Sequence, residues 1–243
     1  MLPRSNGARW NRAERIDRRF FLAGLSSTLS LAPLLAAGRS FGASAFEPLS
    51  LDESAWAGVS FNPCERLIER DGEVLTTTGG YGLVWYVRET FSDFILSIDW
   101  QISKLTDNSG VFFRTPGPCG DDGTNCGCGS AAALDAARDL GHEVQIDERG
   151  FDAADGTVGH AKKVTGAVYD LQAPAQSAAR AVGSWNSYVI GAVGADVWVA
   201  LNGRLINQYV SPAARRRAGY LAIQSYGPAS RVRFRNPAIL KLG

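Results

Sequence analysis

Two carboxylates and an amide alternate along one short stretch of the chain, HEVQIDE at 142–148. If this stretch is a β-strand, alternate side chains point to opposite faces, so Glu143, Gln145 and Asp147 share one face. A carboxylate can act as a general base or acid, and an amide can hold a hydroxyl group. The row is therefore either a solvated outer face or the floor of a site.

The same alternation places chemically useful side chains on the outward face of three other stretches, NSGVFFR, TGAVYDL and YLAIQSY. A polar outer face is ordinary for a β-sandwich. Aromatic rings that alternate with amides and charges instead favour a sugar-binding face, because rings pack on apolar sugar faces and fork-like groups bind hydroxyls. The outward residues of these stretches are Asn108, Phe112, Arg114, Thr165, Tyr169, Tyr220, Gln224 and Tyr226.

These faces require a β fold, and the rest of the chain has the pattern of one. DFILSIDWQIS at 93–103 alternates cleanly, and VWVALNGRLINQYV at 197–210 predicts a hairpin that turns at Asn202-Gly203. Only SAAALDAARDL at 130–140 shows helical periodicity. Many short alternating strands predict an all-β jelly-roll sandwich of two antiparallel sheets, in a single domain over 46–243. Further strands are expected at 57–63, 81–90, 184–193, 219–227 and 231–242.

The N-terminal segment predicts export. Arg18-Arg19 precedes an apolar run that is diluted by Gly, Ser and Thr and ends at Ala43-Ser44-Ala45, a small-x-small cleavage site. Residues 1–45 are therefore expected to be a twin-arginine-type signal peptide, which implies a periplasmic or secreted bacterial protein. The alternative is an N-terminal membrane anchor, although the run is weak for a spanning helix. After cleavage, no stable membrane insertion is expected.

Composition excludes some partners. About 45% of the residues are hydrophobic and 20% charged, which is typical of a globular protein. The first 45 residues hold seven of the 25 basic and two of the 24 acidic residues. The remaining chain has 18 basic and 22 acidic residues, a formal charge of −4. A mildly acidic body gives no electrostatic reason to expect nucleic acid as a partner.

Four cysteines fit an oxidising compartment. Cys119, Cys126 and Cys128 crowd into one Gly-rich segment, and Cys64 stands apart. Their spacing matches no common zinc pattern, so disulfides are the preferred interpretation, with the pairing left open. The acidic pair at 121–122 in the same segment is interpreted as an ordinary loop, and no metal is expected.

The order of the motifs NSGVFFR, HEVQIDE, TGAVYDL, GSWNSYVI, LNG and GYLAIQ followed by FRN resembles the 3-keto-disaccharide hydrolase family over about residues 51–242. The resemblance implies a concanavalin A-like jelly roll in a secreted protein. It also implies cleavage of glycosides already oxidised to a ketone at C3. The Cys-rich insertion at about 115–141 is longer than this family pattern, and it could cover or reshape a pocket.

The activity implied by the resemblance assigns roles to the outward residues. A C3 ketone acidifies the C2 hydrogen, so a carboxylate can remove it, the group on C1 leaves, and water adds afterwards. We expect Glu143 as base, Asp147 as second carboxylate or acid, and Arg114 as the stabiliser of negative charge. No cofactor is expected, because a partner sugar 3-oxidoreductase makes the ketone. The expected substrate-binding residues are Asn108, Phe112, Gln145, Lys163, Tyr169 and Gln224, with His160 a further candidate proton donor.

Two rival functions remain open. A retaining glycosidase of this fold carries E-x-D-x-E on one strand, but Gln145 replaces the middle acid here. Residues four apart on a straight strand also lie about 13 Å apart at the backbone, whereas retention needs carboxyl groups about 5 Å apart. A non-catalytic carbohydrate-binding module fits the aromatic face equally well. Whether Arg114, Glu143 and Gln224 converge within one pocket or lie spread along an open groove would help to distinguish these functions.

Overall fold

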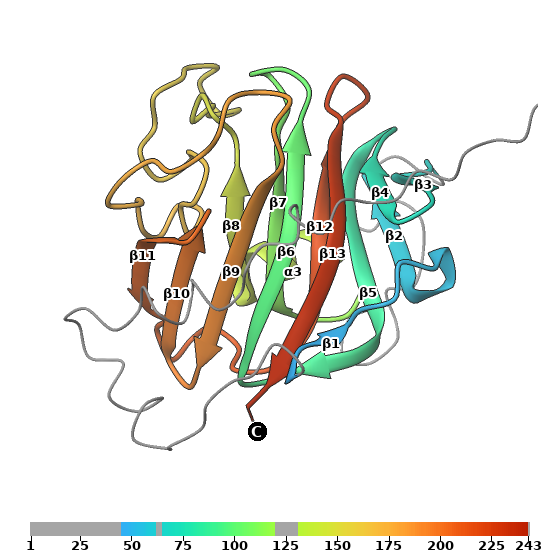
Figure 1. The fold of residues 1–243 in the computed structure, drawn as a ribbon, viewed down its shortest axis with the longest axis vertical. Helices are drawn as coiled ribbons and strands as arrows, with labels where there is room; N and C mark the ends of the chain where they lie inside the picture. The colour runs from blue at the N-terminus through green and yellow to red at the C-terminus, as the bar shows by residue number, and fades with distance from the viewer. Residues whose placement is uncertain (1–44, 62–64, 120–130, 243) are drawn as a thin grey trace, which may run out of the picture. The chain divides into compact units, whose positions relative to one another are not determined.

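A computed structural model describes residues 45–61, 65–119 and 131–242 (Figure 1). Apart from Ala45, the predicted signal peptide lies outside the described residues, and so do three of the four cysteines. Within the described ranges, no helix has both the length and the apolar character needed to cross a membrane.

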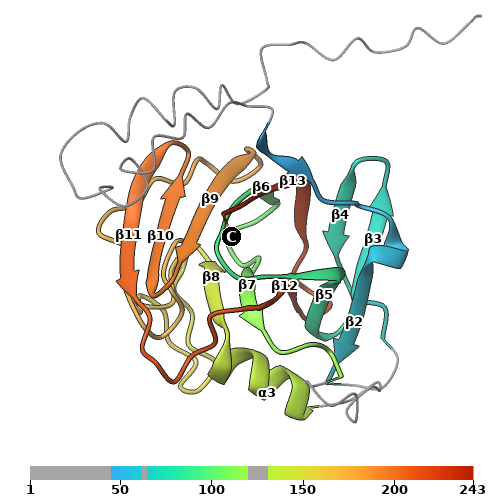
Figure 2. The same cartoon turned by 90° about the horizontal axis from the view of Figure 1, so that it is seen from below.

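Two antiparallel sheets form the body of the protein (Figures 1 and 2). The larger sheet has the order β11-β10-β9-β6-β13-β4-β3, with β1 paired to β13, and the smaller has the order β2-β5-β12-β7-β8. The larger sheet contains β1 (Glu47–Pro48), β3 (Ile68–Asp71), β4 (Val74–Thr77), β6 (Phe94–Ile102), β9 (Asn186–Val193), β10 (Asp196–Leu201), β11 (Arg204–Val210) and β13 (Val232–Lys241). The smaller contains β2 (Trp56–Ser60), β5 (Tyr81–Phe91), β7 (Ser109–Thr115), β8 (His142–Ile146) and β12 (Gly219–Tyr226). This confirms the predicted jelly-roll β-sandwich.

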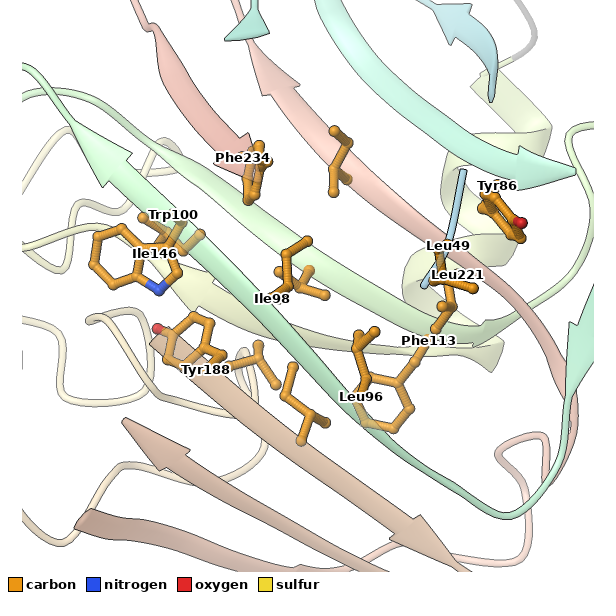
Figure 3. Close-up of a cluster of buried hydrophobic side chains, with 14 of the residues drawn as sticks. Leu49, Tyr86, Leu96, Ile98, Trp100, Phe113, Ile146, Tyr188, Leu221 and Phe234 are labelled. Carbon is orange, nitrogen blue, oxygen red and sulfur yellow. The ribbon is translucent and has the colours of Figure 1, made fainter. Parts of the chain in front are cut away.

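The core lies between the two sheets, where their apolar faces meet. Figure 3 shows Leu96, Ile98 and Trp100 of β6 in one cluster with Phe113 of β7 and Ile146 of β8. All five side chains are buried, and their alternation with polar residues is the pattern that predicted these strands. Because the core takes the residues at 111, 113, 144 and 146, the residues between them must face outward from the smaller sheet.

One helix covers part of that outward face. Helix α3 (Ala131–Leu140) lies against the outer side of the smaller sheet, and its existence confirms the predicted helix at 130–140 (Figure 2). Its Leu134 packs in a second apolar cluster with Trp85 of β5 and Phe112 of β7. The end of the helix is fixed by Arg215, whose guanidinium donates to the carbonyl of Arg138 at 2.9 Å. A three-layer region of sheet, sheet and helix results.

Two expectations about the elements need correction. TGAVYDL at 165–171 is not a strand: Val168 makes only isolated bridges with Val144 and Gln172. Gly166 and Asp170 have φ values of 86° and 58°, which interrupt extended backbone. The sequence pattern also missed β1, β3 and β4, which have two to four residues each. By contrast, Asn202 and Gly203 adopt φ values of 52° and 81°, as the predicted hairpin turn requires.

Candidate active site

The outward face of the smaller sheet is organised in cross-strand rows. In one row Trp85 pairs with Ala222, Ala222 with Phe112, and Phe112 with Glu143. Helix α3 packs on the first three of these residues. Phe112 is only 3% exposed, so the expectation that its ring stacks on a sugar is corrected: the ring supports α3.

Glu143 ends this row, and its carboxylate extends over the next one. The side chain is 6% exposed, and a Cβ built on Gly110 would overlap its Oε1 atom. Gly110 pairs with Gln145 in the ladder between β7 and β8. The missing side chain of Gly110 therefore creates the space that the Glu143 carboxylate occupies.

Burial changes the acidity of Glu143. Desolvation, with a smaller contribution from the charge of Asp170, raises the pKa of Glu143 to about 8. The nearby Lys163 acts in the opposite direction. A carboxyl group with this pKa can take or give a proton near neutral pH.

Two amides flank the Glu143 carboxylate. With its amide group turned to donate, Gln145 Nε2 lies 2.9 Å from Ser109 O and 3.1 Å from Glu143 Oε1. Gln224 lies two residues beyond Ala222 on β12, and so faces the same way and falls beside Gly110. Among the described residues, no group hydrogen-bonds the buried Oε1 atom of Gln224. Gln145 orients the carboxylate, and Gln224 presents an unused acceptor beside it.

A cation and a phenol come from the loop after β8. Lys163 Nζ donates to Tyr169 Oη at 3.1 Å and lies 3.0 Å from Asp170 Oδ1. Burial disfavours the charge of Lys163, but the hydrogen bonds to Tyr169 and Asp170 outweigh it and raise its pKa. Burial also raises the pKa of Tyr169, and the charge of Glu143 adds to this effect. Lys163 is therefore a fixed positive charge near Glu143, as the opposing effect on the Glu143 pKa also indicates.

Two tyrosines extend this face across β12 and β5. Tyr226 pairs with Tyr81 across the strands, and the rings meet edge to face with centroids 5.3 Å apart. The alternation of β12 placed Tyr226 outward but gave it no role, and Tyr81 was missed. Tyr81 opens β5, and its position opposite Tyr226 becomes visible only when the strand register is known.

Arg114 is placed differently from the expectation. Its side chain is fully buried and donates to Ser92 O at 2.8 Å, Gly194 O at 2.7 Å and Asp93 Oδ1 at 2.9 Å. Its φ of 53° breaks the strand alternation, so it does not continue the outward row of Phe112. Arg114 ties the turns before β6 and after β9 together and does not join Glu143 and Gln224.

Asp147 is also committed to the fold. Its Oδ1 accepts from Arg149 N at 2.9 Å, and its Oδ2 accepts from Asn108 Nδ2 at 2.9 Å and Phe151 N at 3.2 Å. Both Asp147 and Asn108 are buried. The expected second carboxylate and the expected substrate amide thus bind each other, and they hold the loop after β8 against the start of β7.

The remaining candidates for chemistry or metal binding lie in the loop after β8, before Lys163 in the sequence, or in the cysteine-bearing segment. His160 Nε2 lies 2.6 Å from Thr157 Oγ1, and it groups with Asp152 and Asp155 in a set of carboxylate and imidazole side chains of which only Asp155 is exposed. Asp152 also lies 3.3 Å from Lys163 Nζ. Cys119 is disulfide-bonded, as predicted, and its partner lies outside the described residues.

The fold and sequence have known relatives. Two candidate glycosyl hydrolases from Parabacteroides distasonis ATCC 8503 share the fold. The first has a TM-score of 0.60 at 19% identity over 81% of this chain and 99% of its own. The second has a TM-score of 0.56 at 22% identity over 82% and 84%. No curated protein sequence matches significantly.

The sequence itself gives the most specific relationship. The profile of the 3-keto-alpha-glucoside-1,2-lyase-like domain matches residues 47–240, which include every strand of both sheets except the last residue of β13. The match covers all the residues that surround Glu143. The chain therefore belongs to the 3-keto-alpha-glucoside-1,2-lyase-like domain family, as the resemblance of its strand motifs indicated.

Proposed function

We propose that this protein cleaves glycosides whose sugar carries a ketone at C3, by elimination across C1 and C2 followed by addition of water. Family membership supports the substrate class. The observation that carries the proposal is the Glu143 carboxylate, which is buried on an outward sheet face beside the Lys163–Tyr169 pair.

Glu143 acts as the general base. The C3 ketone makes the C2 hydrogen acidic, and the carboxylate removes it as a proton. A base works best when its pKa lies near the working pH, and burial raises the pKa of Glu143 to about 8. The hydrogen bond from Gln145 to Oε1 keeps the carboxylate turned toward the substrate.

Tyr169 and Lys163 take the role that the sequence assigned to Arg114. Removal of the C2 proton moves negative charge onto the C3 oxygen. Because Lys163 donates to the Tyr169 oxygen, the hydroxyl hydrogen of Tyr169 is free to bind that oxygen, and the cation strengthens this bond. A donor that is fixed before the reaction stabilises developing charge most effectively.

The enolate electron pair then forms the C1–C2 double bond and breaks the bond between C1 and the leaving group, which departs with a proton from water and leaves hydroxide. The hydroxide adds to C1, and Glu143 returns its proton to C2, which regenerates the base and gives the free 3-keto sugar. The substrate arrives already oxidised, so the electrons balance without a redox step. A separate sugar 3-oxidoreductase must therefore act first. The twin-arginine-type signal peptide predicted at 1–45 would place this reaction in the periplasm or outside the cell.

One alternative has an observation in its favour. The exposed Tyr81 and its partner Tyr226 would also suit a non-catalytic carbohydrate-binding module. A retaining glycosidase is less well supported, because Asp147 is buried and hydrogen-bonded into its loop.

The test is turnover by the protein of residues 46–243. The substrates are a 3-keto disaccharide and the same disaccharide unoxidised, and the readouts are released sugar and the absorbance of the enone intermediate. We expect turnover of the oxidised sugar alone. Glu143→Gln should reduce it by at least about a hundredfold, since general base catalysis contributes on this scale. Glu73→Gln, an exposed carboxylate on the turn between β3 and β4, is the matched control.

Binding of both sugars without turnover would overturn the proposal in favour of the binding module. Turnover of the unoxidised sugar at a similar rate would overturn it in favour of an ordinary glycosidase.

A further inference from the structure

Two tyrosines that the proposed reaction does not use occupy the same sheet face as Glu143. Tyr226 follows Gln224 by two residues on β12, so both side chains point outward. Tyr81 pairs with Tyr226 on β5, and their rings meet edge to face. The Glu143 side of the face supplies hydrogen-bonding groups, and the Tyr81 side supplies apolar ring surface.

Tyr81 is exposed, yet its position is fixed. Its side chain is 48% exposed, whereas Trp85, four residues later on the same face, is fully buried under α3. A Cβ on Gly227 would come within 3.0 Å of the Tyr81 ring, so the ring packs closely on the turn after β12. A rigid exposed aromatic ring offers contact area at a small entropic cost.

Electrostatic interactions with Tyr169 link Tyr226 to Glu143. Burial raises the pKa of Tyr169, and the charge of Glu143 makes a smaller contribution in the same direction. Burial, followed by the influence of Tyr169 and Tyr81, raises the pKa of Tyr226. Tyr169 is therefore an electrostatic neighbour of both Glu143 and Tyr226.

The distance between adjacent strands places Glu143 and the tyrosine pair at two separate positions on the outward face of the smaller sheet. Adjacent strands lie about 4.8 Å apart, so Tyr226 on β12 is about 10 Å from the β8 backbone and Tyr81 on β5 about 14 Å. A sugar ring whose C2 meets Glu143 cannot also cover Tyr81. The tyrosine pair must contact a different part of the substrate.

We infer that Tyr81 and Tyr226 form a second sugar-binding position, which holds the pyranose ring that leaves in the proposed reaction. A pyranose suits this position because it has an apolar face for the rings and hydroxyl groups for the polar atoms around it. Those atoms include Oε1 of Gln224, which accepts no hydrogen bond from the described residues. The inference rests on the proposed function for the identity of the neighbouring, oxidised ring.

The test compares two substrates that share the oxidised ring, a 3-keto disaccharide and the methyl 3-keto glycoside. For Tyr81→Ala and Tyr226→Ala, we expect the ratio of kcat/KM for the disaccharide to that for the methyl glycoside to fall about three- to tenfold, mainly through KM. Tyr226→Phe should keep most of the ratio, because it retains the ring. Val210→Ala, an exposed position on β11 of the other sheet, should leave the ratio unchanged.

Equal losses for both substrates, or no loss for either, would overturn the inference. A second readout does not depend on turnover: calorimetric binding of the disaccharide to Glu143→Gln, with and without the tyrosine substitutions. If the wild-type protein turns over neither substrate but the tyrosines still determine disaccharide binding, the proposed function fails and the second sugar position stands. If turnover occurs but the tyrosines change neither the ratio nor the binding, only the inference fails.

Discussion

The row Trp85–Ala222–Phe112 and the neighbouring row Gln224–Gly110–Gln145 belong to the same face of the same sheet, yet they have opposite environments. Helix α3 covers the first row and makes it an apolar cluster. The second row contains a glycine between two amides and receives the carboxylate of Glu143. Strand alternation decides which face a side chain joins, whereas the segment that covers the face decides whether the side chain supports the fold or is available to a ligand.

The largest effect should come from the covered row. Phe112→Ala removes a ring that is buried between β7 and α3, and we expect a loss of about 3–5 kcal/mol in the free energy of unfolding. Urea denaturation followed by fluorescence measures it. Phe61→Ala, where the ring is exposed, should cost little. A sugar-stacking Phe112 would give the reverse result, with weak binding and near-normal stability.

The row that α3 does not cover should behave in the opposite way when the Glu143 carboxylate over it is neutralised. The pKa of Glu143 is about 8 in the folded protein against an ordinary value of 4.5, so the native state binds more protons than the unfolded state between these pH values. Stability of the wild type therefore falls as pH rises from 4.5 to 8 and then levels off.

Glu143→Gln removes this penalty. We expect the variant to be more stable than the wild type at pH 8 by on the order of a few kcal/mol, with the difference shrinking toward pH 4.5. Thermal unfolding of both proteins across this pH range measures the difference. A constant difference across the range would show that Glu143 does not carry the raised pKa.

Gly110→Ala tests the space that separates the two rows. A methyl group there would overlap Oε1 of Glu143 and come within 2.7 Å of its Cδ and Cγ, so the Glu143 side chain must move. The base then loses its position, and we expect kcat to fall about a hundredfold, since a misplacement of about 1 Å can cost this much. Gly58→Ala on β2 meets only ordinary contacts at 3.5 Å or more and is the control. Equal activity of the two variants would contradict the role of Gly110.

The sequence predicted the sheets well because alternation reports burial directly. It placed Ile146 and Phe113 in the core and Glu143, Gln145 and Gln224 outward, and it found the turn at Asn202. It misplaced Arg114 because a single positive φ ends the alternation at that residue. It also assigned Phe112 to the ligand, because nothing local indicates that a helix twenty residues later covers that ring.

The loop after β8 shows a different limit on what the sequence can predict. Lys163 and Tyr169 were selected by their chemistry, but their contact with each other depends on a chain path with isolated bridges and positive φ values. Asp147 and Glu143 look equivalent in the sequence. Only the structure shows that Asp147 accepts three hydrogen bonds within its own surroundings, while Glu143 lies over a glycine.

The most direct test of the central claim, that Glu143 is the catalytic base, is the dependence of kcat/KM for a 3-keto disaccharide on pH from 5 to 10. This parameter reports ionisation of the free enzyme. We predict that it rises about tenfold per pH unit and levels off above about 8, where Glu143 is ionised, and that this rise is absent from the residual activity of Glu143→Gln. A profile that falls above pH 8 would make Glu143 an acid, and a flat profile would remove it from the reaction.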